Sequence, residues 1–314
     1  MSDRILVTPR SLTDQRPEAF ALLAPLREHG YNVVFGPSGR LPEESELCEL
    51  VDGCVGYLAG IESISAAVLE RAGALRVIAR NGTGVDNVDL VAAAQRGIAI
   101  ERAPGANAQG VAELALALMF SGLRHLTASH EALREGRWVR ILGREAAGRT
   151  LGLVGFGEVG RRLARIATGI GMRVLYNDLT PVADGSGQVS AIFVPLVYLL
   201  GESDVVSLHL PALPGGRVLL GSGELELLRP GAVVVNTSRA SLVDEAAMVG
   251  SLEDGTVSAY CTDVFSEEPP RAGPLRDHPR SVLSAHLGGF TQESVARASQ
   301  LAVEGLLRVL EPEG

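Results

Sequence analysis

The sequence predicts an α/β protein with two Rossmann-like domains, each a doubly wound parallel sheet, separated by an active-site cleft. Short apolar runs of strand length alternate with segments of helical periodicity along the whole chain, a pattern typical of parallel sheets that carry helices on both faces. A glycine-rich turn, GFGEVG, lies between one such run and a helical segment. The length of 314 residues is enough for about two domains.

Residues 1–100 predict one complete alternating set. Strands are expected at 4–8, 31–35, 54–58, 76–79 and 98–100. Helices are expected at 18–29, 43–50, 65–71 and 88–96. The first helix stops at Gly30 and the last at Gly97, where glycine readily adopts the left-handed conformation that follows a helix. Since strands joined through helices run parallel, we expect a flavodoxin-like sheet here.

The next segment interrupts this pattern. Residues 101–107 contain Pro104 and Gly105 and are expected to cross between domains. The helix expected at 108–123 is apolar on almost every side, so it must be buried between domains, against a second subunit, or both. Residues 126–148 are charged and are expected to form an arm that reaches a partner subunit.

A dinucleotide-binding unit is predicted at 151–178. It reads as a strand at 151–154, a glycine turn, a helix at 161–170, a strand at 172–176 and Asp178. Gly155 permits the tight turn, Gly157 lets the backbone approach a pyrophosphate, and Gly160 lets the helix pack on the strand. Asp178 lies close to the position, about 20 residues past the last glycine, from which a carboxylate binds the ribose hydroxyls.

The alternating pattern then resumes towards the C-terminus. Strands are expected at 205–209, 232–236, 257–263 and 281–285, and helices at 196–200, 223–228 and 245–253. The helix at 292–310 follows the completed second sheet, so we expect it to return to the first domain. The predicted domains are therefore a substrate (catalytic) domain, 1–100 plus 290–314, and an NAD-binding Rossmann domain, 101–289.

Three polar residues follow strands of the second sheet, where ligands bind in open α/β folds. These are Arg239, Glu268 and His286. Arginine can hold a substrate carboxylate through two hydrogen bonds and polarise a neighbouring carbonyl. Histidine can supply a proton, and a nearby carboxylate raises its pKa. The set predicts hydride transfer between a 2-hydroxy acid and its 2-keto acid.

Each of these residues has a structural alternative. Arg239 could form a surface ion pair, Glu268 could be a loop carboxylate, and His286 could be a core or capping histidine. His209 also follows a strand and competes with His286 for the role of acid. Gly288 and its neighbour Gly289 favour His286, because glycines leave room for a ligand beside it.

The composition limits the chemistry and the partners. The chain contains no lysine, which excludes a lysine Schiff base or general base. A net charge of −9 argues against nucleic acid or an anionic membrane as partner. The cysteines at 48, 54 and 261 lack metal-ligand spacing, so no metal is expected. Without a signal-peptide pattern or a long apolar run, we expect a cytoplasmic protein.

Seven stretches carry a resemblance to a known family. They lie at 79–90, 103–119, 151–160 with Asp178, 203–214, 230–245, 263–269 and 284–294. With these motifs the chain resembles the D-isomer-specific 2-hydroxyacid dehydrogenases from end to end. The resemblance implies that Arg239 binds the substrate carboxylate and carbonyl, and that Glu268 pairs with the acid/base His286. It also implies a homodimer joined through the nucleotide domains.

The resemblance implies further contacts. For the cofactor, besides the three glycines, these are Glu158, Val159, Asp178, Leu210, Pro211, Thr237, Ser238, Asp263, Gly288 and Thr83. For the substrate they are Asn81, Gly82, Thr83, Gly84 and Asn107. The preference for NAD over NADP is expected because Asp178 would repel a 2′-phosphate and no arginine follows within 179–185.

Within the family the chain is most similar to the 3-phosphoglycerate dehydrogenase-like branch. It departs from that branch at 56–60, where it has no arginine for a substrate phosphate, and at Ala240, where glycine is usual. A hydroxypyruvate or glyoxylate reductase is therefore the alternative. An NADH-sensing corepressor-like binding protein and a phosphonate-oxidising enzyme are further alternatives, whereas Glu268 argues against the formate branch, which uses glutamine there.

Overall fold

The computed structural model describes residues 2–14, 17–181 and 190–311. The chain forms two compact units: unit 1 comprises Met1–Asn107 with Gly289–Gly314, and unit 2 comprises Ala108–Gly288. The chain passes twice between them. The expected assignment of one domain to the substrate and the other to NAD stays a prediction. Part of the loop 179–185 lies outside the described residues.

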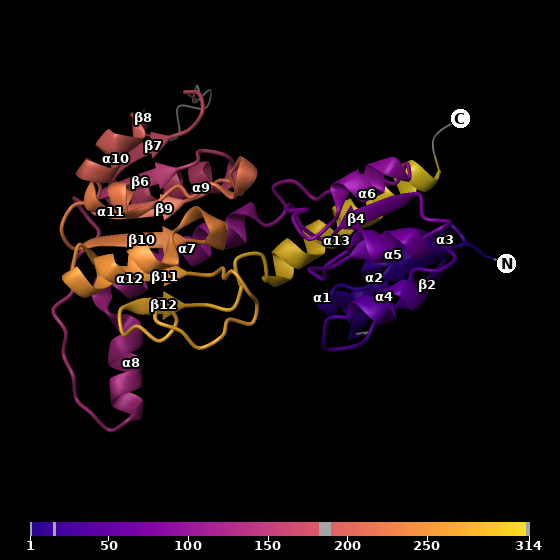
Figure 1. Ribbon diagram of the computed structural model, residues 1–314, viewed down its shortest axis with the longest axis horizontal. Helices are drawn as coiled ribbons and strands as arrows, with labels where there is room; N and C mark the ends of the chain where they lie inside the picture. The colour runs from indigo at the N-terminus through magenta and orange to yellow at the C-terminus, as the bar shows by residue number, and fades with distance from the viewer. Residues whose placement is uncertain (1, 15–16, 182–189, 312–314) are drawn as a thin grey trace. The chain divides into compact units, whose positions relative to one another are not determined.

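Unit 1 contains a parallel sheet of five strands in the order β2-β1-β3-β4-β5. Figure 1 labels β2 and β4 of this sheet. The strands are β1 Arg4–Val7, β2 Asn32–Phe35, β3 Cys54–Ala59, β4 Val77–Arg80 and β5 Ala99–Glu101. The order reverses between β1 and β3, as in flavodoxin-like sheets. The carboxyl ends of these two strands therefore flank the switch point of unit 1.

Helices cover both faces of this sheet. They are α1 Arg10–Thr13, α2 Pro17–Leu22, α3 Ala24–Glu28, α4 Glu44–Leu50, α5 Ala66–Arg71, α6 Leu90–Gln95 and α13 Gln292–Leu310. Apolar side chains of α1, α2, α3 and α13 pack on one face of the sheet. Those of α4, α5 and α6 pack on the other. The last helix thus completes the core of unit 1, although it is remote in the sequence.

Unit 2 contains a parallel sheet of seven strands in the order β12-β11-β10-β9-β6-β7-β8. The strands are β6 Thr150–Val154, β7 Arg173–Asn177, β8 Ala191–Phe193, β9 Val205–Leu208, β10 Ala232–Asn236, β11 Val257–Thr262 and β12 Ser281–Leu283. The order reverses between β6 and β9, which makes the ends of these strands the switch point of unit 2.

The helices of unit 2 also lie on both faces. They are α7 Ala108–Arg124, α8 Leu126–Arg134, α9 Glu158–Gly169, α10 Leu196–Glu202, α11 Ser222–Glu226 and α12 Glu245–Asp254, with short 3-10 turns at Pro214–Gly216 and Ala240–Leu242. Helices α7 and α9 share one core with the sheet, and α10, α11 and α12 share the other. Much of the apolar surface of α7 is therefore covered inside unit 2.

One expectation about the helices was wrong, and helix α8 and strand β8 were not expected. The single helix expected at 18–29 is two helices, α2 and α3, and Pro25 lies in the first turn of α3. The charged arm starts with helix α8, which follows a left-handed His125 with φ 53°. Strand β8 was not expected, because its apolar residues run on across Pro195 into the apolar start of α10.

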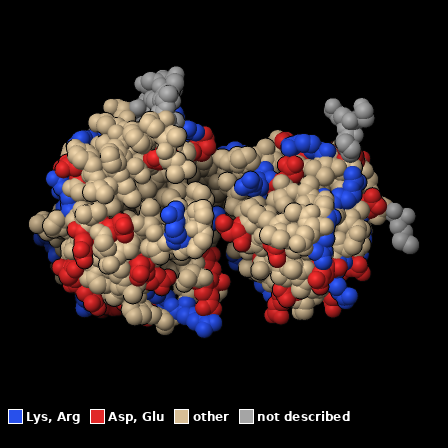
Figure 2. Space-filling view, turned by 45° about the horizontal axis from the view of Figure 1, so that its top comes forward, with Lys and Arg blue, Asp and Glu red and all other residues tan. Residues whose placement is uncertain are grey.

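On the face shown in Figure 2, arginine side chains lie scattered among acidic ones over both units. Over the described part of the chain, no single helix has the length and apolar character to cross a membrane. The pair α7 and α8 passes that test only when taken together, and it is bent by 68°.

Candidate active site

The glycine loop lies at the switch point of unit 2, between β6 and α9. Gly155 has a φ of +95°, and a Cβ there would lie 2.3 Å from the carbonyl oxygen of His209. A Cβ on Gly160 would lie 2.4 Å from the carbonyl oxygen of Gly155. Both positions therefore require glycine, and the N-terminus of α9 is held directly at the sheet edge. Such a helix end offers N–H groups and a partial positive charge to phosphates.

Two carboxylates stand beside this loop. Asp178 follows β7 and accepts hydrogen bonds from the N–H of Phe156 and of Leu179, each at 2.7 Å. The loop and this predicted ribose ligand are thus joined directly. Glu158, in the first turn of α9, accepts from Arg161 at 2.5 Å, and this hydrogen bond lowers the pKa of its carboxyl. The negative charge of Glu158 is therefore paired with Arg161.

The ends of β9 and β10 carry two buried polar atoms without hydrogen-bond partners among the described residues. They are Nδ1 of His209 and Oγ1 of Thr237. Ser238, in contrast, donates its hydroxyl to the carbonyl of Leu208 at 2.7 Å. Buried polar groups are normally satisfied, so a ligand with polar groups fits this edge. Together with the two obligatory glycines and Asp178, these atoms fit a dinucleotide.

His209 is poorly suited to the role of acid. Its Nε2 lies 2.8 Å from the Ser207 hydroxyl. Burial of the ring lowers its pKa to about 3, because the charged form loses its hydration. The ring is therefore neutral at neutral pH and has no proton to give as an imidazolium. This argues against His209 as the acid, and the role expected of His286 stays a prediction.

His286 and Glu268 form a close pair. Nδ1 of His286 lies 2.8 Å from Oε2 and 3.0 Å from Oε1 of Glu268. The N–H of Phe265 donates to Glu268 Oε1 at 3.2 Å and steadies the carboxylate. Both side chains are partly accessible, with 46% of His286 and 32% of Glu268 exposed. The histidine is thus oriented by its partner and reachable from solvent.

The pair shifts the proton affinity of both partners. The pKa of His286 is raised, first by the hydrogen bond to Glu268 and also by its charge, although burial acts in the opposite direction. For Glu268, burial favours the neutral form, but the hydrogen bond and charge of His286 outweigh it, so its pKa is lowered. Each partner therefore favours the charged form of the other.

Asp263 shapes the loop that carries His286. It is almost fully buried. Its carboxylate accepts from the Ser284 hydroxyl (2.6 Å) and from the N–H groups of Leu287 (2.7 Å) and Gly288 (2.8 Å). These bonds hold His286 in a left-handed conformation with φ 53°. Ser284 was missed by the sequence reasoning, and the cofactor contact expected of Asp263 stays a prediction.

The expectation that the two glycines after His286 leave room for a ligand was wrong. A Cβ on Gly288 would lie 3.2 Å from Asp263 Oδ2 and 3.2 Å from Val111. One on Gly289 would lie 3.0 Å from the side chain of Asn107. The space beside each glycine is occupied by protein, so these residues serve close packing.

Arg239 belongs to the same neighbourhood. The turn after β10 is folded by Asn236, which donates to the carbonyl of Arg239 at 2.9 Å and accepts from the N–H of Ser238 at 3.0 Å. The charge of Arg239 acts to lower the pKa of both Glu268 and His286. Unit 2 therefore brings the three predicted catalytic residues together. Asn236 was missed, although a polar residue that closes an apolar strand was its visible signal.

The remaining predicted residues of the sites are spread over both units. Leu210 and Pro211 follow β9 in unit 2, and Val159 lies in the first turn of α9. In unit 1, Asn81 to Gly84 follow β4. The Thr83 hydroxyl donates to the carbonyl of Ala103 at 3.1 Å and lies 3.3 Å from Oδ1 of Asn107. Two predicted substrate residues are thus neighbours.

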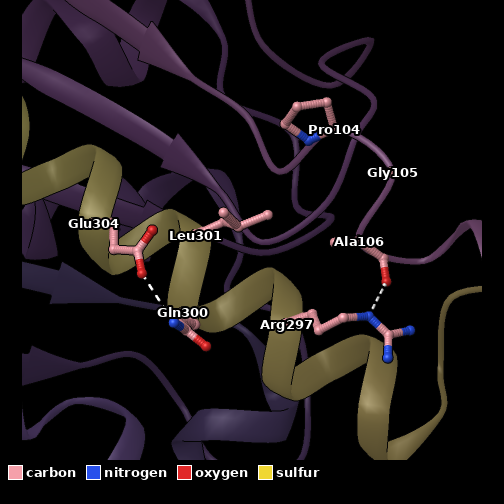
Figure 3. Close-up of a pocket in the computed structure, with 7 residues that line it drawn as sticks. All are labelled: Pro104, Gly105, Ala106, Arg297, Gln300, Leu301 and Glu304. Carbon is pink, nitrogen blue, oxygen red and sulfur yellow. Dashed lines mark hydrogen bonds between the residues drawn. The ribbon is translucent and has the colours of Figure 1, made fainter.

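A side chain on α13 anchors the segment before Asn107. Nε of Arg297 donates to the carbonyl of Ala106 at 2.9 Å (Figure 3). Nη2 of the same arginine lies 3.3 Å from the Ser294 hydroxyl. A pocket of about 290 Å³ beside this contact is lined by Pro104, Gly105, Ala106, Arg297, Gln300, Leu301 and Glu304. No sequence signal points to this anchor, because its partner is a backbone atom remote in the chain.

Comparison with known proteins gives consistent results. The family model described as "D-isomer specific 2-hydroxyacid dehydrogenase, NAD binding domain" matches residues 116–288. A glyoxylate reductase from Korarchaeum cryptofilum is 34% identical over 274 residues, 85% of this chain and 82% of the relative. A D-3-phosphoglycerate dehydrogenase from Methanocaldococcus jannaschii is 32% identical over 276 residues, 87% of this chain but 53% of the relative. The crystal structure of TT0316 protein from Thermus thermophilus has a TM-score of 0.87 and 37% identity, and the match covers 98% of this chain and 97% of that one.

Proposed function

Because the chain belongs to the D-isomer specific 2-hydroxyacid dehydrogenase family, we propose that it interconverts a small 2-keto acid and its D-2-hydroxy acid through Arg239, Glu268 and His286. It is an NAD-dependent oxidoreductase, as its relatives are. The observation that carries the proposal is the hydrogen-bonded Glu268–His286 pair, with the charge of Arg239 acting on both members.

His286 supplies the proton that the reduced carbonyl oxygen needs. Since Nδ1 faces Glu268, Nε2 is the ring nitrogen left to donate. The raised pKa lets the ring hold its proton to higher pH than an ordinary histidine would. Glu268 stays charged and stabilises the imidazolium. In the reverse direction, the neutral ring accepts the proton of the hydroxyl group at the same atom.

Arg239 binds the substrate carboxylate. Its planar guanidinium can donate two parallel hydrogen bonds to a carboxylate and still polarise the adjacent carbonyl. Asn236 fixes the turn from which it projects. The chain contains no lysine, so arginine, backbone N–H groups and helix ends are its means of holding an anionic substrate.

NADH, when bound, supplies the two electrons of the reduction as a hydride. Its pyrophosphate would lie on the N–H groups that follow Gly157, and its adenosine ribose on Asp178. The Thr237 hydroxyl, which has no partner among the described residues, and the carboxyl ends of β9 and β10 support the same placement. Asp178 would repel a 2′-phosphate, which supports NAD over NADP.

Glyoxylate and hydroxypyruvate are the substrates best supported. The glyoxylate reductase relative matches over most of both chains, whereas the phosphoglycerate dehydrogenase relative is nearly twice as long as the matched part. Oxidation of D-3-phosphoglycerate is the second candidate, supported by several relatives of that name.

The test is a panel of keto acids with purified protein and NADH. Oxidation of NADH is followed with glyoxylate, hydroxypyruvate, pyruvate, 2-ketoglutarate and phosphohydroxypyruvate. We expect turnover with glyoxylate or hydroxypyruvate. Turnover of none of the five, in a preparation that binds NADH, would reject the proposal.

We also propose a homodimer formed through unit 2. Large apolar side chains are exposed along α7, α8 and the segment that follows: Phe120, Leu126, Leu133, Trp138, Val139, Ile141 and Leu142. Trp138 and Leu142 are 81% and 95% exposed. Several large apolar side chains exposed together on one surface are typical of a protein–protein interface. Light scattering should give the mass of a dimer, and the double substitution Trp138→Glu, Leu142→Glu should shift it to the monomer. A monomeric parent protein would contradict this.

A further inference from the structure

A buried carboxylate lies at the switch point of unit 1, and no step of the proposed reaction uses it. Glu62 is only 2% exposed. Its Oε1 accepts hydrogen bonds from the Tyr57 hydroxyl at 2.7 Å, from the N–H of Gly60 at 2.8 Å and from the Thr8 hydroxyl. Thr8 follows β1 and Gly60 follows β3. Glu62 therefore joins the ends of the two strands between which the strand order reverses.

This carboxylate fills the place where open α/β sheets usually bind a ligand. Among the described residues, Oε2 of Glu62 has no hydrogen-bond partner. It packs against Gly60: a Cβ on residue 60 would lie 2.6 Å from Oε2 and 3.2 Å from Cα of Pro9. Residue 60 must therefore stay without a side chain while Glu62 is folded inward. The carboxylate of Glu62 thus takes the volume directly after β3.

A buried arginine lies in the same neighbourhood. Arg80 ends β4 and is 6% exposed. Its Nε donates to the carbonyl of Gly84 and its Nη1 to the carbonyl of Ala59, both at 3.0 Å. The pKa of the Tyr57 hydroxyl is raised by burial and then by the charge of Glu62, whereas the charge of Arg80 acts to lower it. Both charges thus act on one buried hydroxyl.

These charges have opposite effects on an approaching ligand. Alone, the guanidinium of Arg80 would make this edge attractive to an anionic group. The carboxylate of Glu62 offsets that attraction and occupies the volume at the switch point. Arg80 also holds Gly84, which belongs to the loop of predicted substrate residues. The two side chains therefore set the charge and the space beside that loop.

We propose that Glu62 is a specificity-determining residue, which favours 2-keto acids with a small, uncharged substituent over those with a second anionic group. Glyoxylate, pyruvate and hydroxypyruvate belong to the favoured class, and phosphohydroxypyruvate and 2-ketoglutarate to the other. The inference rests on the proposed function, since it names which keto acids that site takes. Glu62 acts through charge and volume and touches no reacting atom.

The test compares hydroxypyruvate with phosphohydroxypyruvate, which differ by one phosphate group. The preference, the ratio of their kcat/KM values, is measured for the parent protein, Glu62→Gln and Glu70→Gln. Glutamine keeps the shape and one acceptor oxygen of Glu62 but removes the charge. Glu70 is an exposed residue of α5 in the same unit, so Glu70→Gln is the matched control.

We expect the parent protein to prefer hydroxypyruvate by about tenfold or more. Glu62→Gln should reduce this preference by about tenfold, through a lower KM for phosphohydroxypyruvate and with kcat for hydroxypyruvate little changed. Glu70→Gln should keep the parent ratio. A KM effect confined to the doubly anionic substrate separates this role from a purely structural one, which would affect both substrates.

Two results would overturn the inference. One is a parent protein that uses both substrates equally well or prefers the phosphorylated one. The other is a folded Glu62→Gln variant that keeps the parent ratio. If the variant does not fold, the ratio of the parent protein decides alone. Reduction of no keto acid at all would instead reject the proposed function, and the inference with it.

Discussion

Oε2 of Glu268 lies 2.8 Å from Nδ1 of His286, so the carboxylate fixes which ring nitrogen is left to exchange a proton. The same contact raises the pKa of the ring and lowers that of the carboxyl. Asp263 holds the backbone of the loop that carries the ring. Orientation and proton affinity are thus set by Glu268, and loop conformation by Asp263.

The first prediction concerns pH. Reduction needs protonated His286, so kcat/KM for a keto acid should stay constant below the raised pKa of the ring and fall as pH rises through it. Glu268→Gln removes the hydrogen bond and the charge that raise this pKa, so the fall should move to lower pH. Oxidation of the hydroxy acid should show the opposite dependence. A profile that does not move in Glu268→Gln would contradict the pairing.

The stability of the protein should depend on pH through the same pair, Glu268 and His286. The raised pKa of His286 contributes stability below its unfolded value, about 6.5, and this contribution is lost as pH rises through the folded pKa. The lowered pKa of Glu268 contributes above about 4.3 and is lost as pH falls through the folded pKa. The Tm difference between the parent protein and Glu268→Gln should therefore be largest between these limits and shrink on both sides. A difference that does not vary with pH would argue against an ion pair.

The glycine loop can be tested with two substitutions on one helix. Gly160→Ala places a Cβ 2.4 Å from a backbone oxygen, whereas a Cβ on Gly169 meets no described atom within 4 Å. We expect Gly160→Ala to lower the free energy of unfolding by about 1–3 kcal/mol and to weaken NADH binding. Gly169→Ala should neither lower the free energy of unfolding nor weaken NADH binding. Calorimetry with titration of NADH checks both, and equal behaviour of the two variants would count against the close packing.

Arg297 should act as a positioning residue for Asn107. Arg297→Gln removes the charged donor to Ala106, and the displaced segment should lower kcat/KM for the keto acid by up to about 100-fold. Arg297→Lys, which can still donate, should recover part of the loss. Arg308→Gln is the control, because Arg308 lies on the same helix in an exposed ion pair with Glu101. Equal effects at 297 and 308 would exclude a positioning role.

Much of the fold follows from sequence because its signals are local. Apolar runs, glycine turns and helical periodicity placed most of the strands and helices of both sheets. Strand β8 was missed because its apolar residues run on across Pro195 into the apolar start of α10. The break before α3 was missed because the apolar pattern continues across Pro25.

The residues of the candidate site also fall into two groups: those that the sequence indicated and those that only the structure revealed. Arg239, Glu268 and His286 were found because each follows a strand. The roles of Asn236, Ser284 and Arg297 depend on hydrogen bonds to atoms that the sequence does not bring together. The neutral state of His209 depends on burial, which a strand-end position does not reveal. Sequence thus gave the candidate residues, whereas the contacts that orient them required the structure.

The most direct test of the central claim is to measure turnover and NADH binding on one preparation of His286→Ala. We expect a fall in kcat for keto acid reduction of about 10²–10⁴-fold, with the Kd for NADH within about twofold of the parent value. His29→Ala, at the C-cap of α3 in unit 1, should behave as the parent protein does. Retained turnover in His286→Ala, or an equal loss of NADH binding, would contradict the assignment of His286 as the proton donor.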